Sequence, residues 1–370
     1  MAHSDLSDIE NNYTPQTPTT SSSIVAPSSN YNPISYQNIT IDRDNDDPDH
    51  PESYISTDTQ TPKPDDQQLQ QKQSSGGVTK TVDIIGSTPL IESIFKGNYE
   101  NAEELISTSP QMINIAEPNQ GYTPLFLAVE IENEEIAFKL SKQLIEAGAI
   151  IRVITKGGTT PFAQACLNGH LRVAQYMASL DNLLITETVV PIPPILLAAE
   201  QGHLNVVQWL TSNGAYIYAQ ISIPQSTTRG LMALHQASFK GHLEVVRFFV
   251  EQCGMYIEDR SNLLGVTALY MAIEQNKLET AKYLLERGSD PNVCRTDGVF
   301  GLYMCAQFGS VEMIKLILGF GANPNLLYNG KTALDIATQK NFTEIINILT
   351  PLTDPSLIKE SSSSSNCRII

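Results

Sequence analysis

The stretch GHLNVVQWL (202–210) returns almost unchanged as GHLEVVRFF (241–249). In each copy a glycine precedes apolar residues three or four positions apart, which is the spacing of one face of a helix. Glycine tolerates the left-handed backbone that closes a helix, so this position ends one helix and the apolar run starts another. The two copies therefore predict a helical module that the chain uses repeatedly.

A second pattern, Thr-Pro-Leu-x-x-Ala-x-x-x-Gly, leads into that glycine and fixes the frame of the repeat. Threonine caps a helix, proline suits its first position, and leucine and alanine then fall on one helical face. The threonine position recurs with gaps of 35, 37, 33, 39, 35, 33 and 32 residues, at Thr88, Thr123, Thr160, Pro193, Met232, Thr267, Phe300 and Thr332. Glycines are expected to end the first helix at Gly169, Gly202, Gly241 and Gly309, and the second helix at Gly148, Gly214, Gly288 and Gly321.

A period near 33 residues with this motif resembles the ankyrin repeat, in about eight copies that cover nearly all of residues 83–350. The resemblance implies an all-α solenoid of helix–turn–helix repeats with hairpin loops, stacked because no repeat can bury its apolar face alone. Some copies depart from the pattern. The fourth has IPP at 192–194, the seventh (298–309) lacks Thr-Pro, and an insertion follows the fourth at 220–230.

The flanks differ from the repeats in composition. Residues 1–82 are rich in polar residues and proline, with 12 acidic and 4 basic side chains, and are expected to form a disordered arm. Residues 83–350 form the predicted repeat domain, and 351–370 a flexible Ser-rich tail. The net charge is −17, which disfavours nucleic acid as a partner because phosphate backbones are repelled.

Targeting segments, cysteine spacing and catalytic motifs bear on where the protein resides and on whether it catalyses a reaction. The start shows no basic and apolar signal segment, no run reaches the length of a membrane helix, and the five cysteines are scattered. These features predict a protein of the cytoplasm or nucleus without a transmembrane segment. No catalytic motif is found, so we predict no enzyme activity, no cofactor and no metal. His170, His203 and His242 recur at one position of the repeat, which indicates a structural role, and we expect the same of His235.

The resemblance implies a protein–protein interaction scaffold or adaptor, with partners on the concave side formed by first helices and hairpin tips. Aromatic and arginine side chains are common interface anchors, although scattered surface aromatics are equally ordinary. By position in the repeat, the first-helix candidates are Phe239, Lys240, Glu274, Gln275, Gln307 and Phe308, with Tyr270 and Tyr303 beside them. The candidates at the hairpin tips are Arg260, Arg295 and Asp297.

Both ends of the chain carry candidate modification sites. The final Cys367-Arg-Ile-Ile matches a prenylation signal behind a Ser-rich tether, which offers an alternative function as a lipid-anchored, membrane-associated regulator or effector. Against it, Arg368 is unusual in an aliphatic slot and no polybasic stretch assists a single lipid. The arm holds candidate phosphorylation sites at Ser7, Thr14, Thr17 and Thr61.

Overall fold

A computed structural model describes residues 87–186, 190–224 and 226–358. In these ranges the chain forms helices and three isolated β-bridges, with no β-strand, which confirms the predicted all-α class. The predicted arm at 1–82, its phosphorylation sites, and the end of the tail with Cys367 lie outside the described residues.

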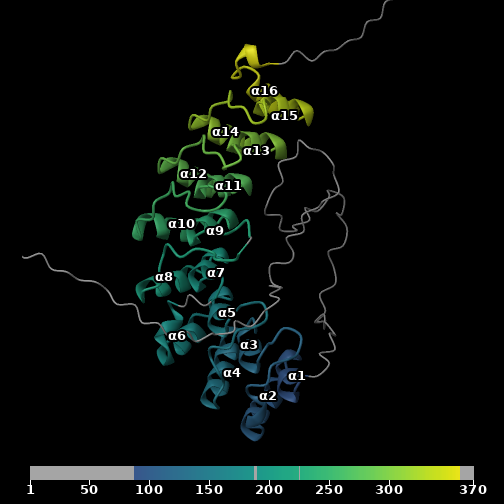
Figure 1. Cartoon of the computed structure of the whole chain (residues 1–370), viewed down its shortest axis with the longest axis vertical. Coiled ribbons are helices and arrows are strands. Elements are labelled where there is room, and N and C mark those ends of the chain that lie inside the picture. Colours follow the sequence, from purple (N-terminus) through teal and green to yellow (C-terminus); the bar gives the residue numbers. More distant parts are fainter. Residues whose placement is uncertain (1–86, 187–189, 225, 359–370) are drawn as a thin grey trace, which may run out of the picture. The chain divides into compact units, whose positions relative to one another are not determined.

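Eight helix pairs follow one another in the described ranges, one for each predicted repeat (Figure 1). Their bounds are α1 (Pro89–Phe95), α2 (Tyr99–Thr108), α3 (Pro124–Val129), α4 (Glu134–Glu146), α5 (Pro161–Leu167), α6 (Leu171–Leu180), α7 (Pro194–Glu200), α8 (Leu204–Ser212), α9 (Ala233–Lys240), α10 (Leu243–Arg247), α11 (Ala268–Glu274), α12 (Leu278–Glu286), α13 (Gly301–Phe308), α14 (Val311–Gly319), α15 (Ala333–Gln339) and α16 (Thr343–Leu349). A π-helix (Phe248–Gln252) continues α10, and 3-10 helices occupy Pro110–Met112, Asn182–Leu184 and Pro355–Leu357.

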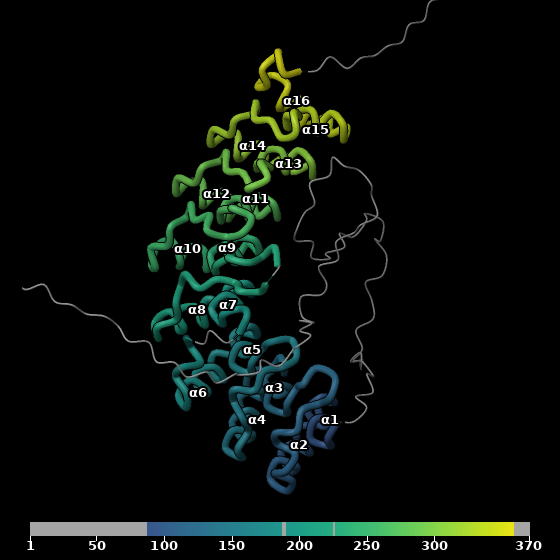
Figure 2. The backbone as a smooth tube through the Cα atoms, viewed as in Figure 1, coloured from purple at the N-terminus to yellow at the C-terminus, as the bar shows by residue number. Residues whose placement is uncertain are grey.

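The helices lie in two rows (Figure 2). Each odd-numbered helix packs against the odd-numbered helices of its neighbouring repeats, and most even-numbered helices pack in the same way along the second row. One continuous apolar core runs between the rows from Leu90 to Leu349. Stacking therefore supplies the burial that a single repeat lacks.

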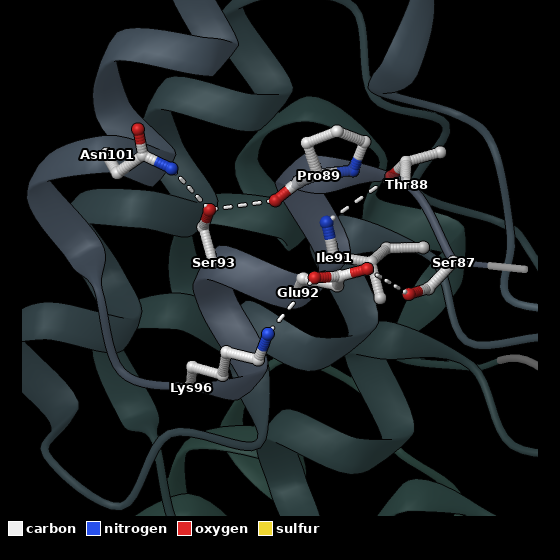
Figure 3. Close-up of polar contacts among 8 residues, drawn as sticks. All are labelled: Ser87, Thr88, Pro89, Ile91, Glu92, Ser93, Lys96 and Asn101. Carbon is white, nitrogen blue, oxygen red and sulfur yellow. Dashed lines mark hydrogen bonds and ion pairs between the residues drawn. The ribbon is translucent and has the colours of Figure 1, made fainter. Parts of the chain in front are cut away.

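The Thr-Pro motif starts first helices in the way the pattern predicts. The Thr88 hydroxyl accepts a hydrogen bond from the Ile91 amide at 3.3 Å (Figure 3). On the same helix, the Ser93 hydroxyl donates to the Pro89 carbonyl and accepts from the Asn101 side-chain amide at 2.6 Å. The last bond joins α1 to α2, so the cap and the pairing of the two helices are set within one short stretch.

Repeats that lost the threonine still begin their first helix at the expected place. Pro193, Met232 and Phe300 precede α7, α9 and α13 without accepting a hydrogen bond through the side chain. In α9 the ring of His235 takes over part of this task, because its Nδ1 accepts from the Met232 amide at 3.3 Å and its Nε2 donates to the Asp259 carbonyl. The predicted structural role of His235 is confirmed.

The recurring Gly-His pair joins successive repeats. Gly202 has a φ of +78°, and a side-chain carbon built on it would lie 2.5 Å from the ring of His242. That ring donates from Nε2 to the Glu200 carbonyl at 2.8 Å, and His203 and His170 make equivalent bonds to Leu167 and the second repeat. Glycine is required both for the left-handed turn and for the space that the next repeat's histidine fills.

Candidate partner-binding surface

We call the surface made by the odd-numbered helices and by the hairpins between repeats the first-helix face. The predicted binding residues belong to it, but they differ widely in exposure. Phe308 at the end of α13 is 50% exposed, Arg260 is exposed, and Lys240 and Gln275 are partly exposed. These four are available to a partner.

The prediction that Phe239 is exposed is wrong, because the side chain is only 2% exposed. Helix α9 packs against α7 on one side and α11 on the other, and Phe239 joins the apolar core between them. The Lys240 ammonium lies 5.8 Å from the centre of the Phe239 ring and pairs with Glu200 at 3.5 Å. Gln307, at the same position of α13, is also buried and corrects a second predicted exposure.

Tyr270 and Tyr303 are buried as well, so neither is a surface anchor. Both are the third residue of their helix, which is the position of His235 in α9. At this position a side chain lies beneath the hairpin of the following repeat. The Tyr303 ring meets Tyr328 of that hairpin edge to face, with ring centres 5.0 Å apart.

The two hairpin arginines serve the fold. Arg295 is buried and donates to the Asp297 carboxylate at 2.5 Å, which contradicts its predicted place at an exposed tip. Arg260 is exposed, yet its guanidinium donates to the Gly265 carbonyl at 2.7 Å and to the Cys294 carbonyl of the next hairpin. These bonds brace one hairpin against its neighbour.

Three repeats carry a carboxylate at the same position near the end of the first helix: Glu130, Glu200 and Glu274. Burial raises the pKa of Glu130, and a hydrogen bond from Gln164 opposes that rise. Burial also raises the pKa of Glu274 to about 7, and the charge of Arg295 opposes it. Glu130 is nevertheless exposed at the surface, whereas Glu274 is only partly exposed, so Glu274 is the less well solvated of the two.

One groove on this face was not predicted from the sequence. It has a volume of about 540 Å³ between the first two repeats, and its walls include Ile94, Phe95, Tyr99, Tyr122, Leu127, Glu130 and Ile131. Phe95 is 45% exposed at the end of α1, in the same position of its repeat as Phe239. The signal was present in the repeat frame, because Phe95 occupies in the first repeat the position that Phe239 occupies in the fifth.

A second hollow of about 480 Å³ lies beside the predicted insertion. Val190, the start of α7 and the exposed Tyr216 contribute to its walls, together with Tyr218 and Gln220. Tyr216 and Tyr218 pack with ring centres 6.1 Å apart. The hollow adds an aromatic edge to the hairpin after the fourth repeat.

The remaining reactive side chains have structural surroundings. Cys166 and Cys305 are buried, and burial raises the pKa of both thiols far above the usual range. Trp209 is partly buried and packs near Phe162, with ring centres 6.4 Å apart. Within residues 87–186, 190–224 and 226–358, no three His, Cys, Asp or Glu side chains gather to hold a metal ion, and no helix has the length and apolar character needed to span a bilayer.

Comparison with known proteins gives a consistent result. A family model described as ankyrin repeats (3 copies) matches residues 90–185, 195–294 and 287–357, which is more than half of the chain. The ankyrin repeat domain of human ASB11 superposes with a TM-score of 0.52 at 25% identity, covering 63% of this chain and 99% of that domain.

Two curated proteins show how the similarity is distributed. The chain is 27% identical over 241 residues to ankyrin repeat and KH domain-containing protein mask-1 of Caenorhabditis elegans, covering 61% of this chain and 8% of that protein. It is 24% identical over 157 residues to human ankyrin repeat domain-containing protein 63, covering 42% of this chain and 41% of that protein. The chain thus spans less than half the length of either relative, and the similarity concerns the repeats.

Proposed function

Because the chain belongs to the ankyrin repeat family and so carries a protein–protein interaction domain, we propose that it is a non-catalytic scaffold or adaptor that binds a partner protein on its first-helix face. In ankyrin stacks this face is the concave side, where neighbouring repeats present a continuous surface to a ligand. Proteins of this family are generally interaction modules without enzymatic activity.

The observation that carries the proposal is the groove between the first two repeats. Its walls are mostly apolar and aromatic, and Phe95 remains 45% exposed in it although most large apolar side chains of the odd-numbered helices are buried. An apolar hollow with a few polar groups at its edge is typical of a binding site, and aromatic side chains are common anchors. Glu130, an exposed residue, supplies a carboxylate beside the apolar walls.

Phe308 extends the same argument to the seventh repeat. It is the last residue of α13, and half of its surface is exposed on the same face. A partner that covers Phe95, Phe308 or both removes the remaining apolar surface from water, which contributes about 0.7–1.5 kcal/mol for each because about half of each side chain is already buried.

The test is affinity capture from eukaryotic cytosol with the full chain as bait. Wild type is compared with the double variant Phe95→Ala/Phe308→Ala and with Phe320→Ala. Phe320 is 40% exposed at the end of α14, in the other row of helices, so it controls for the loss of an exposed aromatic ring. Circular dichroism must first show that all three baits keep the wild-type helix content.

We expect a set of proteins that wild type and Phe320→Ala retain and that the double variant loses. Equal capture by all three baits would place the contacts elsewhere and refute the assignment of the first-helix face. Loss by Phe320→Ala alone would move the site to the even-numbered helices.

A further inference from the structure

The Tyr270 hydroxyl is a buried polar group that has no hydrogen-bond partner among the described residues. The side chain is 1% exposed, and its oxygen makes no hydrogen bond in the described part of the chain. The equivalent side chains in other repeats are satisfied: His235 bonds to two backbone groups, and Asp335 accepts from the Thr332 amide at 2.7 Å. A buried hydroxyl without a partner is rare and unfavourable, so this one calls for an explanation.

Glu274 lies one helical turn after Tyr270 on α11, so the two side chains share one side of the helix. It is partly exposed, and its carboxylate forms no hydrogen bond or ion pair with another described residue. Its counterpart in the fourth repeat, Glu200, is paired with Lys240 at 3.5 Å. The same position of the sixth repeat therefore holds a carboxylate without such an ion pair among the described residues.

The charges around these two groups favour a cation over an anion. The following hairpin contributes Arg295 and Asp297, which act electrostatically on Tyr270 together with Glu274 and, from α13, Cys305. Arg295 is buried and bonded to Asp297, so its charge is already balanced and out of reach of an anionic ligand. When Glu274 is ionised, the cluster therefore carries one uncompensated negative charge.

The raised pKa of Glu274 indicates that its ionised carboxylate is unfavourable without a nearby cation. The pKa of Glu274 is raised to about 7 because the side chain is poorly solvated, even though Arg295 lowers it. Near neutral pH the site therefore holds a proton for much of the time. A bound cation would take the place of that proton.

We propose that Glu274 and Tyr270 form a site for one lysine or arginine side chain of the partner protein. The Glu274 carboxylate accepts a charge-assisted hydrogen bond from the ammonium or guanidinium group. The Tyr270 oxygen is buried in the unbound chain, so it accepts a second N–H of the same group only after the side chains above it move as the ligand binds. Phe308, exposed on α13 beside α11, offers apolar surface to the aliphatic stem of the ligand. This inference rests on the proposed function and names the chemistry of one contact within it.

The experiment uses the purified full chain and three capped pentapeptides, in which glycines flank a lysine, an arginine or a norleucine. Norleucine matches the stem of lysine without its charge. The Glu274 carboxyl carbon is followed by NMR in protein labelled at glutamate, and its signal is assigned from the variant Glu274→Gln. Binding is measured at pH 7 with peptide up to about 10 mM, the range expected for a single charged contact.

We expect a saturable shift of the Glu274 signal and a lower pKa for its carboxyl with the lysine and arginine peptides, and neither change with norleucine. Tyr270→Phe keeps the ring and removes only the hydroxyl, so it should weaken peptide binding about tenfold. An unchanged pKa with lysine and arginine, or an equal response to norleucine, would overturn the proposal. Unaltered affinity in Tyr270→Phe would remove the hydroxyl from the site.

The capture experiment separates this inference from the function on which it rests. If Glu274→Gln captures partners as wild type does while Phe95→Ala/Phe308→Ala does not, the first-helix face binds the partner and the cation site is wrong. If Glu274→Gln loses partners that Glu279→Gln retains, the cation site is supported, because Glu279 is an exposed carboxylate on α12 in the other row.

Discussion

Replacing Glu274 by glutamine should stabilise the protein, and the gain should grow as the pH rises. Burial raises the pKa of Glu274 from 4.5 to about 7, so the folded chain holds this proton more tightly than the unfolded chain does. Between these two pKa values the unfolded state has bound fewer protons than the folded state, and stability falls with increasing pH. Glutamine resembles the protonated carboxyl and does not ionise, so Glu274→Gln removes this loss.

The size of the effect follows from the two pKa values. At pH 8 the folded state carries an ionised, poorly solvated Glu274, which costs about 3 kcal/mol relative to the protonated form. At pH 5 the carboxyl is protonated in the folded state and partly ionised in the unfolded chain, and the cost is about 0.8 kcal/mol. The advantage of Glu274→Gln should therefore increase by about 2.5 kcal/mol between pH 5 and pH 8.

Urea unfolding followed by circular dichroism at pH 5, 6, 7 and 8 measures this difference directly. Glu279→Gln is the control, because Glu279 is exposed on the neighbouring α12 and water screens its charge. If the stability of Glu274→Gln parallels that of wild type over the whole range, the carboxylate is well solvated. That result would refute the reasoning and would also weaken the cation site built on it.

Three further comparisons test the fold and the corrected surface by urea unfolding. Phe239→Ala should cost about 3–5 kcal/mol because the ring is buried, whereas Phe308→Ala should cost only about 1 kcal/mol because half of the side chain is exposed; equal costs would contradict the assigned burial. Gly202→Ala should be less stable than Gly214→Ala, although both glycines have positive φ, because only Gly202 faces a histidine ring at contact distance. Burial lowers the pKa of His235, so its contribution to stability should be lost as the pH falls below 6.5, opposite in sign to that of Glu274. Acidification from pH 7 to pH 5 should therefore favour His235→Gln over wild type; an identical pH dependence in the two proteins would show that this histidine does not contribute to it.

The fold was predictable because its determinants are local and repeated. The Thr88 cap, the positive φ of Gly202 and the apolar spacing that follows it each depend on a few neighbouring residues, and each recurs at the period of the repeat. A repeat that lacks one of these three features can still be located in the sequence by the other two. For this reason the frame located Phe300 correctly at the start of α13 although no threonine or proline marks it.

Side-chain exposure was harder to predict, because it depends on helices that are distant in the sequence. Phe95 and Phe239 occupy the same position of the repeat, yet one is 45% and the other 2% exposed. Helix α9 has odd-numbered neighbours on both sides, whereas α1 packs against only α3 within the described odd-numbered row. Lys240 then pairs with Glu200 above the buried ring, a contact between residues forty positions apart that no local pattern encodes.

The wide separation of the exposed aromatics limits how a partner can bind. Phe95 belongs to the first repeat and Phe308 to the seventh, so one ligand that covers both must be a folded domain or a long extended segment. Two short segments would instead occupy the two ends independently. Captured proteins that respond to Phe95→Ala and to Phe308→Ala singly, with losses that add in the double variant, would indicate one extended ligand with two separate contacts. Distinct sets lost by each single variant would indicate two ligands, and Glu274, one repeat before Phe308, would then contribute to only one of them.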